Sequence, residues 1–325
     1  MKCTLQITAP SRLHFGLLRF AQAAGPSYGG LGMMLDQPAT VVDIRLADTW
    51  QASGPNADRA LAFAQQACRY YSCKSPLSIH VRKTPPAHVG LGSGTQLALA
   101  IARGVGSLLN RPVPNVDELS TAVGRGRSAI GSHGFSQGGL LWETGRDSSE
   151  SLAKLTRRLD VPEQWRVLLI TPPHDAGLHG SAEVDAFAQL PPVPPEVTTK
   201  LQRLANEKIL PAVEQADFAT FSESLYEYGH LAGCCFAPVQ GGPYASPDVA
   251  RCVDTLRSLG LQGVGQSSWG PTIFAFTSNE SSANQWLDTL STLPEFASSN
   301  TTVATPNNSG ASITQSSSSG PTGQP

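Results

Sequence analysis

The residues of this chain best placed to do chemistry lie in a glycine-rich loop, TPPAHVGLGSGTQLALA, at positions 84–100. Glycines at three of five successive positions leave the backbone free to fold back with its N–H groups exposed. The apolar helix that follows adds its own unpaired N–H groups and the positive end of its dipole. Such a loop binds phosphate or pyrophosphate. The predicted phosphate site comprises Gly90, Leu91, Gly92, Ser93, Gly94, Thr95 and Gln96.

The loop does not match the two best-known nucleotide-binding motifs. A P-loop has a lysine and a serine or threonine after its second glycine, and residues 90–96 contain no lysine. The dinucleotide fingerprint fails because its third glycine is missing. Residues 124–129 fit a looser GxGxxA pattern, but they follow a helical stretch rather than a strand, so chance explains that match better. On spacing alone, the loop could also be a tight strand-to-helix turn without a ligand.

Composition excludes several classes of partner. The chain has 325 residues, 40% of them hydrophobic and 15% charged, with a formal net charge of -2. This balance argues against binding to nucleic acid or to an anionic membrane. No apolar run is long enough to span a bilayer, and residues 1–15 alternate like a strand rather than a signal peptide. The six cysteines show no CxxC pair or zinc spacing. We therefore expect a cytoplasmic protein with reduced thiols.

The elements around the loop predict an α+β protein of two domains. Periodicity indicates strands at 3–9, 39–46 and 77–81, and helices at 56–71 and 93–109. Asn115, with Glu118 three residues later, indicates the N-cap of another short helix. The order lacks the strict βαβ rhythm of a doubly wound sheet. We place the domains at residues 1–160 and 161–297. We expect a glycine-rich functional loop within 124–145 that enters a strand at 139–143. We also expect a disordered tail at 298–325, which is almost all Ser, Thr, Asn, Gly, Pro and Gln.

Two further polar segments accompany the phosphate loop. They are APSRLHFGLL at 9–18 and GVGQSSWGPTI at 263–273. Together the three segments resemble the motifs of the GHMP kinase superfamily over about residues 1–295, and the second motif is the specific one. This resemblance implies an N-terminal domain like domain 2 of ribosomal protein S5, a ferredoxin-like C-terminal domain, and an active cleft between them.

The chain departs from the kinases of that superfamily. Gly94 and Thr95 stand where kinases commonly have a second serine. Residues 134–138 contain no carboxylate, whereas kinases often have an aspartate there that acts as the base. The sequence resembles one branch better, the β-ribofuranosylaminobenzene 5′-phosphate synthases. The likeness rests on residues 11–17, 30–33, 125–139 and, above all, 263–272.

This branch resemblance implies a reaction of phosphoribosyl pyrophosphate with 4-aminobenzoate or 4-hydroxybenzoate. The products would be a C-riboside, CO₂ and pyrophosphate. Two alternatives stay open, an ATP-dependent small-molecule kinase and a nucleotide-binding regulator without catalysis. The missing aspartate argues against the kinase, and the polar residues of the three motifs argue against the regulator.

The resemblance also implies roles for single residues. Arg12 would grip a phosphate or carboxylate in bidentate fashion, His14 would donate to the pyrophosphate or the aromatic acid, and Trp269 would stack on a ring. The alternatives are an ordinary ion pair for Arg12, a core histidine and a core tryptophan. Thr95 would meet a phosphate-bound Mg²⁺. Further substrate contacts are predicted at Gly30, Gly32, Arg125, Ser136, Gln266, Ser267 and Ser268.

Two expectations remain. His174 and His179 stand five residues apart with acidic neighbours, but a polar loop explains them better than a metal site. A homodimer is expected only because homodimers are common among soluble proteins.

Overall fold

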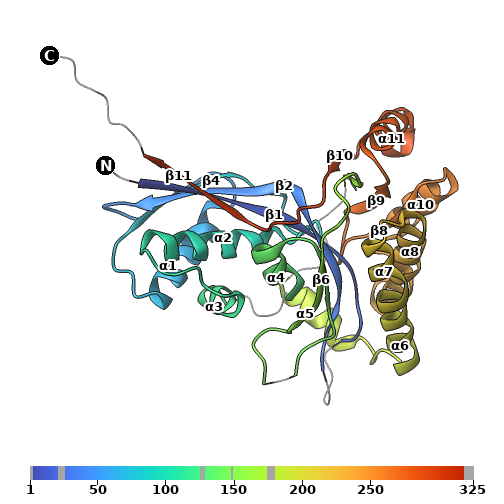
Figure 1. Cartoon of the computed structure of the whole chain (residues 1–325), viewed down its shortest axis with the longest axis horizontal. Coiled ribbons are helices and arrows are strands. Elements are labelled where there is room, and N and C mark those ends of the chain that lie inside the picture. Colours follow the sequence, from blue (N-terminus) through green and yellow to red (C-terminus); the bar gives the residue numbers. More distant parts are fainter. Residues whose placement is uncertain (1–2, 21–25, 125–128, 148, 174–179, 318–325) are drawn as a thin grey trace.

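A computed structural model of the chain describes residues 3–20, 26–124, 129–147, 149–173 and 180–317, with only the backbone for 180–184. Two β-sheets lie side by side, each with its own helices (Figure 1). All strands of the first sheet except one near the C-terminus lie before residue 160, and the second sheet begins at Arg166. No helix of the described part is long and apolar enough to cross a membrane.

The first sheet is built on two long, bent strands. Strand β1 pairs with β2 along most of its length, with irregularities between Ala9 and Ser11 and between His14 and Gly16. These bulges bend the strands and let them continue well past the predicted ends at 9 and before 39. The order is β11-β1-β2-β4-β3, with β5 paired to β2 and β6 paired to β5. The strands are β1 (Cys3–Leu17), β2 (Gly30–Leu46), β3 (Gln51–Ser53), β4 (Leu77–Lys83), β5 (Leu140–Glu143), β6 (Leu155–Leu159) and β11 (Ser312–Ser317).

Helices lie along one face of this sheet (Figure 1). Helix α2 (Ser93–Leu108) lies at the centre and is almost wholly buried, as its unbroken apolar sequence predicts. It is flanked by α1 (Ala57–Tyr70), α3 (Val116–Ala122) and α4 (Ala129–Gln137). The predicted cap of α3 is confirmed, because the Asn115 side chain accepts a hydrogen bond from the Glu118 N–H at 2.8 Å.

Helix α4 stands where a loop was predicted before residue 139, whereas the strand predicted at 139–143 is present as β5. The glycines of α4 weaken the helical signal of the sequence, yet they serve packing. A Cβ at Gly134 would overlap the Met34 side chain, so glycine lets α4 lie directly on β2. Most of α4 is consequently buried.

The second sheet has the order β10-β7-β9-β8, and every neighbouring pair is antiparallel. In chain order this is 4-1-3-2, the arrangement of a ferredoxin-like unit, so the predicted α+β fold with such a C-terminal domain is confirmed. The strands are β7 (Arg166–Thr171), β8 (Gln262–Gln266), β9 (Ile273–Thr277) and β10 (Asn300–Ala304). The helices are α5 (Gly180–Gln189), α6 (Pro195–Arg203), the π-helix Leu204–Ile209, α7 (Leu210–Glu214), α8 (Phe218–Cys234), α9 (Ala237–Gln240), α10 (Pro247–Ser258), α11 (Glu280–Thr292) and a 3-10 turn at Pro294–Phe296.

The prediction of a disordered tail is wrong for residues 298–317. After β10 completes the second sheet, the chain returns to the first sheet, where Leu35 and Pro306 form a bridge and β11 pairs with β1 from Cys3 to Thr8. The mostly polar sequence of β11, SITQSS, suits an edge strand, because backbone pairing requires little apolar surface from the strand itself. The remainder of the predicted tail, 318–325, lies outside the described residues.

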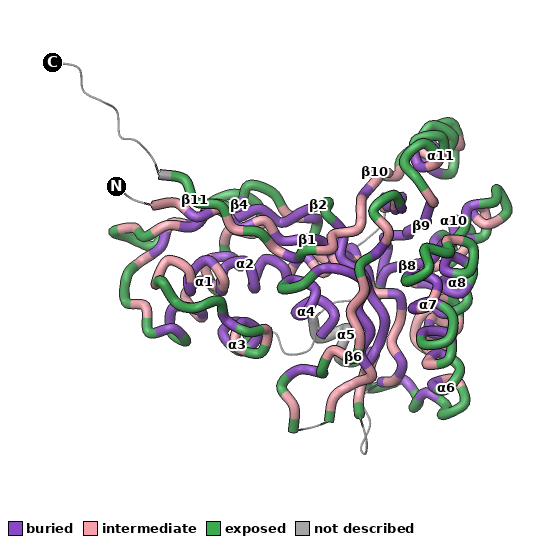
Figure 2. Tube along the Cα trace, in the orientation of Figure 1, coloured by how far each residue is buried: buried purple, intermediate pink, exposed green. Residues whose placement is uncertain are grey.

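The two sheets share a core. Phe15 of β1 packs against Phe274 and Phe276 of β9, with ring centroids 5.1 and 6.2 Å apart. Figure 2 shows buried segments of both sheets meeting at this junction. Trp142 of β5 and Tyr228 of α8 extend the same cluster. The junction is thus a packed wall, and a site at its edge is held by both domains.

Candidate active site

A cavity of about 640 Å³ opens beside the shared core. This volume is ordinary for the binding site of a small molecule. Its walls come from β1, the phosphate loop, the N-terminal end of α4, helix α8 and the turn between β8 and β9. The structure therefore brings the three predicted motifs to one place.

The phosphate loop has the geometry of an anion site. Gly90 and Gly92 have positive φ angles of 90° and 70°, which glycine adopts without strain. The Thr95 and Gln96 N–H groups both donate to the Gly92 carbonyl. Among the described residues, the N–H groups of Gly92, Ser93 and Gly94 donate to no backbone carbonyl. They open the 16-residue helix α2, so the helix dipole adds to their attraction for an anion.

Two members of the predicted phosphate site have other roles. The Gln96 side chain is buried, and its amide donates to the Gly131 carbonyl of α4 at 2.9 Å. Leu91 packs in the shared core, and its carbonyl accepts the Arg12 N–H at 3.0 Å. Both hold the loop in place. Neither residue lines the cavity, and a direct contact of either with phosphate stays a prediction.

Ser267 joins the three motifs. Its hydroxyl is fully buried, donates to the Gly90 carbonyl at 2.8 Å, and accepts the His14 N–H at 3.1 Å. The neighbouring Ser268 N–H donates to the His14 carbonyl. Ser267 was predicted to contact substrate, but its hydroxyl is already engaged, so it positions the loop against β1. Ser268 does line the cavity.

Arg12 lies directly against the phosphate loop. A Cβ built on Gly92 would stand 3.2 Å from the Arg12 Cβ and 3.4 Å from Nε. The guanidinium Nη2 donates to the Gly90 carbonyl at a long 3.4 Å. Arg12 also lines the cavity. The side chain is therefore positioned to bind a phosphate on the loop.

His14 lines the cavity two residues further along β1. Burial, and secondly the positive charge of Arg12, lower its pKa to about 3. The ring is consequently neutral at physiological pH and offers one N–H donor and one acceptor nitrogen. In this neutral form His14 can hydrogen-bond a substrate. Before an anion binds, the ring is not an imidazolium ion and cannot act as a proton donor in that form.

An aromatic cluster forms another wall. Trp269 is only 8% exposed and meets Phe187 and Phe236 edge-on, with centroids 5.4 and 4.8 Å apart. Tyr28 continues the cluster against Phe187. All four rings line the cavity. Trp269 thus belongs to the wall as part of a packed group, and a role in stacking on substrate stays a prediction.

The structure places other predicted contacts elsewhere. Gly30 and Gly32 are buried within β2, where a Cβ would meet the His14 ring at 2.9 Å and the Ile130 side chain at 2.5 Å respectively. They make room for neighbours rather than touch substrate. Ser136 is exposed at the far end of α4, outside the cavity, because seven residues of helix separate it from the cavity end by about 10 Å. These three predictions are wrong.

Gln266 lines the cavity, but its side-chain amide hydrogen-bonds to backbone groups. It accepts the Ala245 N–H at 2.7 Å and donates to the Ser268 carbonyl at 2.8 Å. Gln266 therefore shapes the turn more than it offers free donors. Arg125, His174 and His179 lie outside the described residues.

Sequence reasoning missed Glu143, at the end of β5. It is 4% exposed and lines the cavity, where it is the one carboxylate among the described lining residues. Burial raises its pKa to about 7, and the Gly145 N–H, Arg19 and Arg146 only partly oppose this. A single glutamate at the end of the apolar run GGLLWE gives no sequence signal of this kind; only strand register brings it to the site.

Metal-binding potential is limited. The described residues contain no group of three or more His, Cys, Asp or Glu that could hold a metal ion. The Thr95 hydroxyl lines the cavity in the first turn of α2. One hydroxyl beside an anion site fits an Mg²⁺ ion that is bound mainly by substrate phosphates, which is a common mode for this metal.

Comparison with known proteins decides the family. Models of the N-terminal and C-terminal domains of GHMP kinases match residues 58–137 and 209–293. A β-ribofuranosylphenol 5′-phosphate synthase from Methanothermobacter thermautotrophicus is 31% identical over 300 residues, covering 85% of this chain and 90% of the relative. The enzyme of the same name from Archaeoglobus fulgidus is 32% identical, covering 84% and 88%. This chain belongs to that synthase family. The predicted superfamily and branch are both confirmed.

Solved structures show the same fold at much lower identity. A putative homoserine kinase from Listeria monocytogenes superposes with a TM-score of 0.70 at 16% identity, covering 95% of this chain and 99% of the kinase. A mevalonate diphosphate decarboxylase from Staphylococcus aureus gives 0.66 at 13%, covering 97% and 98%. This chain thus has the same fold as these two enzymes.

Proposed function

We propose that this enzyme joins phosphoribosyl pyrophosphate to 4-hydroxybenzoate or 4-aminobenzoate at a carbon atom, with release of CO₂ and pyrophosphate. The observation that carries the proposal is the single cavity in which the anion-binding loop, Arg12 and an aromatic wall meet. A nucleophilic side chain is not required, because the aromatic ring itself attacks the ribose. The proposal also agrees with the name of the relatives, β-ribofuranosylphenol 5′-phosphate synthase.

The leaving pyrophosphate is the part of the substrate that suits the loop. Negative charge grows on it as the bond to the anomeric carbon breaks. The N–H groups of Gly92, Ser93 and Gly94 and the Arg12 guanidinium are already fixed around this position, so they stabilise the charge without reorganisation. When bound, Mg²⁺ neutralises pyrophosphate charge, with Thr95 as its protein contact.

The aromatic acid then belongs against the wall formed by Tyr28, Phe187, Phe236 and Trp269. The wall would hold the carboxylate-bearing ring carbon next to the anomeric carbon. The bimolecular reaction then becomes effectively unimolecular. Neutral His14 lines the same cavity and can hydrogen-bond either reactant without repelling the cationic anomeric centre. The apolar wall also excludes water, which would otherwise capture that centre.

The test is direct. The protein is incubated with phosphoribosyl pyrophosphate, Mg²⁺ and carboxyl-labelled 4-hydroxybenzoate or 4-aminobenzoate, and CO₂ and pyrophosphate are measured together. Equal release of both is the expected result, and Arg12→Ala should raise the KM for phosphoribosyl pyrophosphate at least tenfold. Pyrophosphate without CO₂ would indicate hydrolysis only. ATP consumption with a small alcohol, and no release of CO₂, would favour the kinase.

A further inference from the structure

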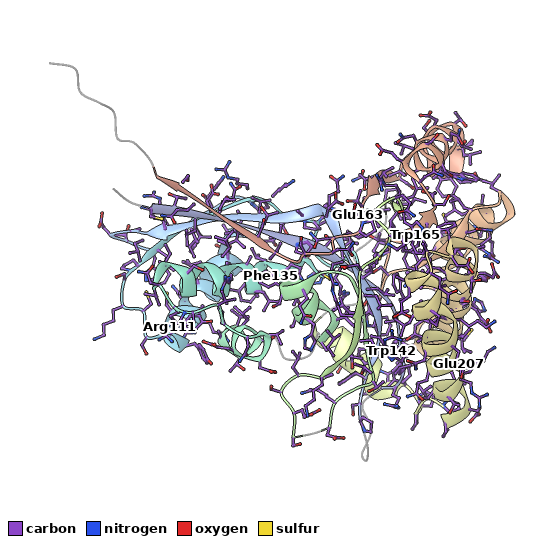
Figure 3. All side chains as sticks on the ribbon, viewed as in Figure 1. Arg111, Phe135, Trp142, Glu163, Trp165 and Glu207 are labelled. Carbon is purple, nitrogen blue, oxygen red and sulfur yellow. The ribbon has the colours of Figure 1, made fainter. Side chains whose placement is uncertain are left out.

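Glu143 occupies a defined position relative to the two motif residues of β1. In the ladder, Arg12 pairs with Met34, His14 with Gly32, and Gly30 with Glu143. Residues opposite each other in a sheet point to the same face, as do residues two apart in a strand. Arg12, His14 and Glu143 therefore share one face of the first sheet. Trp142, labelled in Figure 3, points to the opposite face and packs in the shared core.

Gly30 separates His14 from Glu143. A Cβ at Gly30 would stand 2.9 Å from His14 Cε1, so the imidazole lies over this glycine, while Glu143 is its neighbour on the other strand. Cα atoms of paired residues are about 5 Å apart. The partners of Arg12 and Glu143 are four residue steps apart on β2, a distance of about 13 Å along the strand. Arg12 at the phosphate loop and Glu143 therefore border the same cavity at positions well apart, with His14 between them.

The Glu143 carboxylate has one oxygen held and one available. Oε2 accepts the Gly145 N–H at 2.7 Å, whereas Oε1 makes no hydrogen bond with the described residues. The charged groups that face it are Arg19 and Arg146, with the buried phenol of Tyr228 on α8. Arg19 donates to the Thr144 carbonyl and Arg146 to those of Glu150 and Ser151, and neither forms an ion pair with Glu143.

Resting on the proposed function, we propose that Glu143 is the catalytic base that takes the proton from the para hydroxyl of the aromatic acid. The geometry points to this atom because Glu143 lies at the end of the cavity away from the loop. A ring whose carboxylate-bearing carbon faces the ribose turns its para substituent away from the ribose. A half-ionised carboxyl near neutral pH is also matched to such a transfer.

The step balances as follows. Glu143 Oε1 takes the hydroxyl proton, and the oxygen electron pair moves into the ring. The ring carbon that bears the carboxylate forms a bond to the anomeric carbon while the bond to pyrophosphate breaks. The resulting cyclohexadienone loses CO₂, and the electron pair of the broken bond restores the aromatic phenolate. The phenolate then recovers its proton from Glu143, so no other oxidant, reductant or base is required.

The test variant is Glu143→Gln, which keeps the shape and an oxygen for the Gly145 N–H but cannot take a proton. The matched control is Glu163→Gln, an exposed glutamate in the connector after β6, labelled in Figure 3. Turnover is measured with 4-hydroxybenzoate and with 3,5-difluoro-4-hydroxybenzoate, whose more acidic hydroxyl is already ionised at neutral pH. For 4-hydroxybenzoate, we expect kcat of Glu143→Gln to fall by about 100-fold. The fluorinated substrate should restore it to within tenfold of the wild type, with KM for phosphoribosyl pyrophosphate unchanged.

An equal loss with both substrates would overturn the assignment, because a structural role predicts no rescue. The acidic limb of the wild-type pH profile, centred near pH 7, should disappear only in Glu143→Gln. A second readout is independent of turnover: bound 4-hydroxybenzoate should show the ultraviolet absorption of its phenolate in the wild type and the control, but not in Glu143→Gln. Failure of the wild type to release CO₂ would reject the proposed function, whereas absence of the phenolate spectrum in the wild type would reject the role of Glu143.

Discussion

Replacing Ser267 by alanine tests whether one hydroxyl holds the site together. In the wild type this hydroxyl donates to the Gly90 carbonyl and accepts the His14 N–H, and it is fully buried. The variant removes one oxygen and leaves two backbone groups without that partner. Water has no access to replace it as long as the turn keeps its shape.

The magnitude follows from what each group loses. A buried polar group left without a partner costs about 1–3 kcal/mol. The His14 N–H would bear that full cost, while the Gly90 carbonyl still accepts a long hydrogen bond from Arg12 and loses less. We therefore expect Ser267→Ala to lower the free energy of unfolding by about 2–4 kcal/mol. Because Gly90 begins the phosphate loop, affinity for pyrophosphate should fall at least tenfold.

Urea denaturation measures the first quantity and isothermal titration with pyrophosphate the second. Ser136→Ala, an exposed serine outside the cavity, is the matched control and should change neither. A Ser267→Ala protein within about 0.5 kcal/mol of the wild type, which is the usual range for surface substitutions, would refute the reasoning. It would mean that the motifs hold their positions without this hydroxyl.

Three other outcomes can be checked by similar means. Gly30→Ala should lower kcat/KM more than tenfold and destabilise the protein by about 1–3 kcal/mol, since its Cβ would press on His14 and on the Gly16 carbonyl; wild-type kinetics and melting would contradict this. Folding raises the Glu143 pKa from 4.5 to about 7, so the wild type should lose stability as the pH rises from 4.5 to 7. In denaturation experiments, Glu143→Gln should be about 3 kcal/mol more stable than the wild type at pH 8 and equally stable at pH 4. A difference that does not depend on pH would contradict this. Deleting residues 312–325 should lower the free energy of unfolding by about 1–3 kcal/mol and promote aggregation, seen by light scattering, because it exposes the edge of β1. Unchanged stability and unchanged scattering would argue otherwise.

The sequence revealed the parts of this protein whose signals are local. The phosphate loop, helix α2 and the Asn115 cap each depend on a few adjacent residues, and the structure has all three. Helix α4 was missed because its glycines, which serve contact with β2, look like loop residues until the sheet is known.

Other features depend on pairing between distant segments. Glu143 enters the cavity only through its register with Gly30, and Ser267 becomes a link only when the turn after β8 meets β1. The residues of β11 have too little apolar surface to fold alone, and their order comes from the backbone of β1. No local pattern carries such information.

The return of the chain to its first strand has a consequence for biosynthesis. Cys3 pairs with Ser317, so one side of β1 lacks its partner until more than 300 further residues have been made. The second sheet likewise waits for β10 before its order is complete. A nascent chain therefore cannot finish the N-terminal domain first and the C-terminal domain afterwards. We expect the two domains to reach the native state together, after synthesis, with the exposed edge of β1 as the surface that chaperones must cover in the meantime.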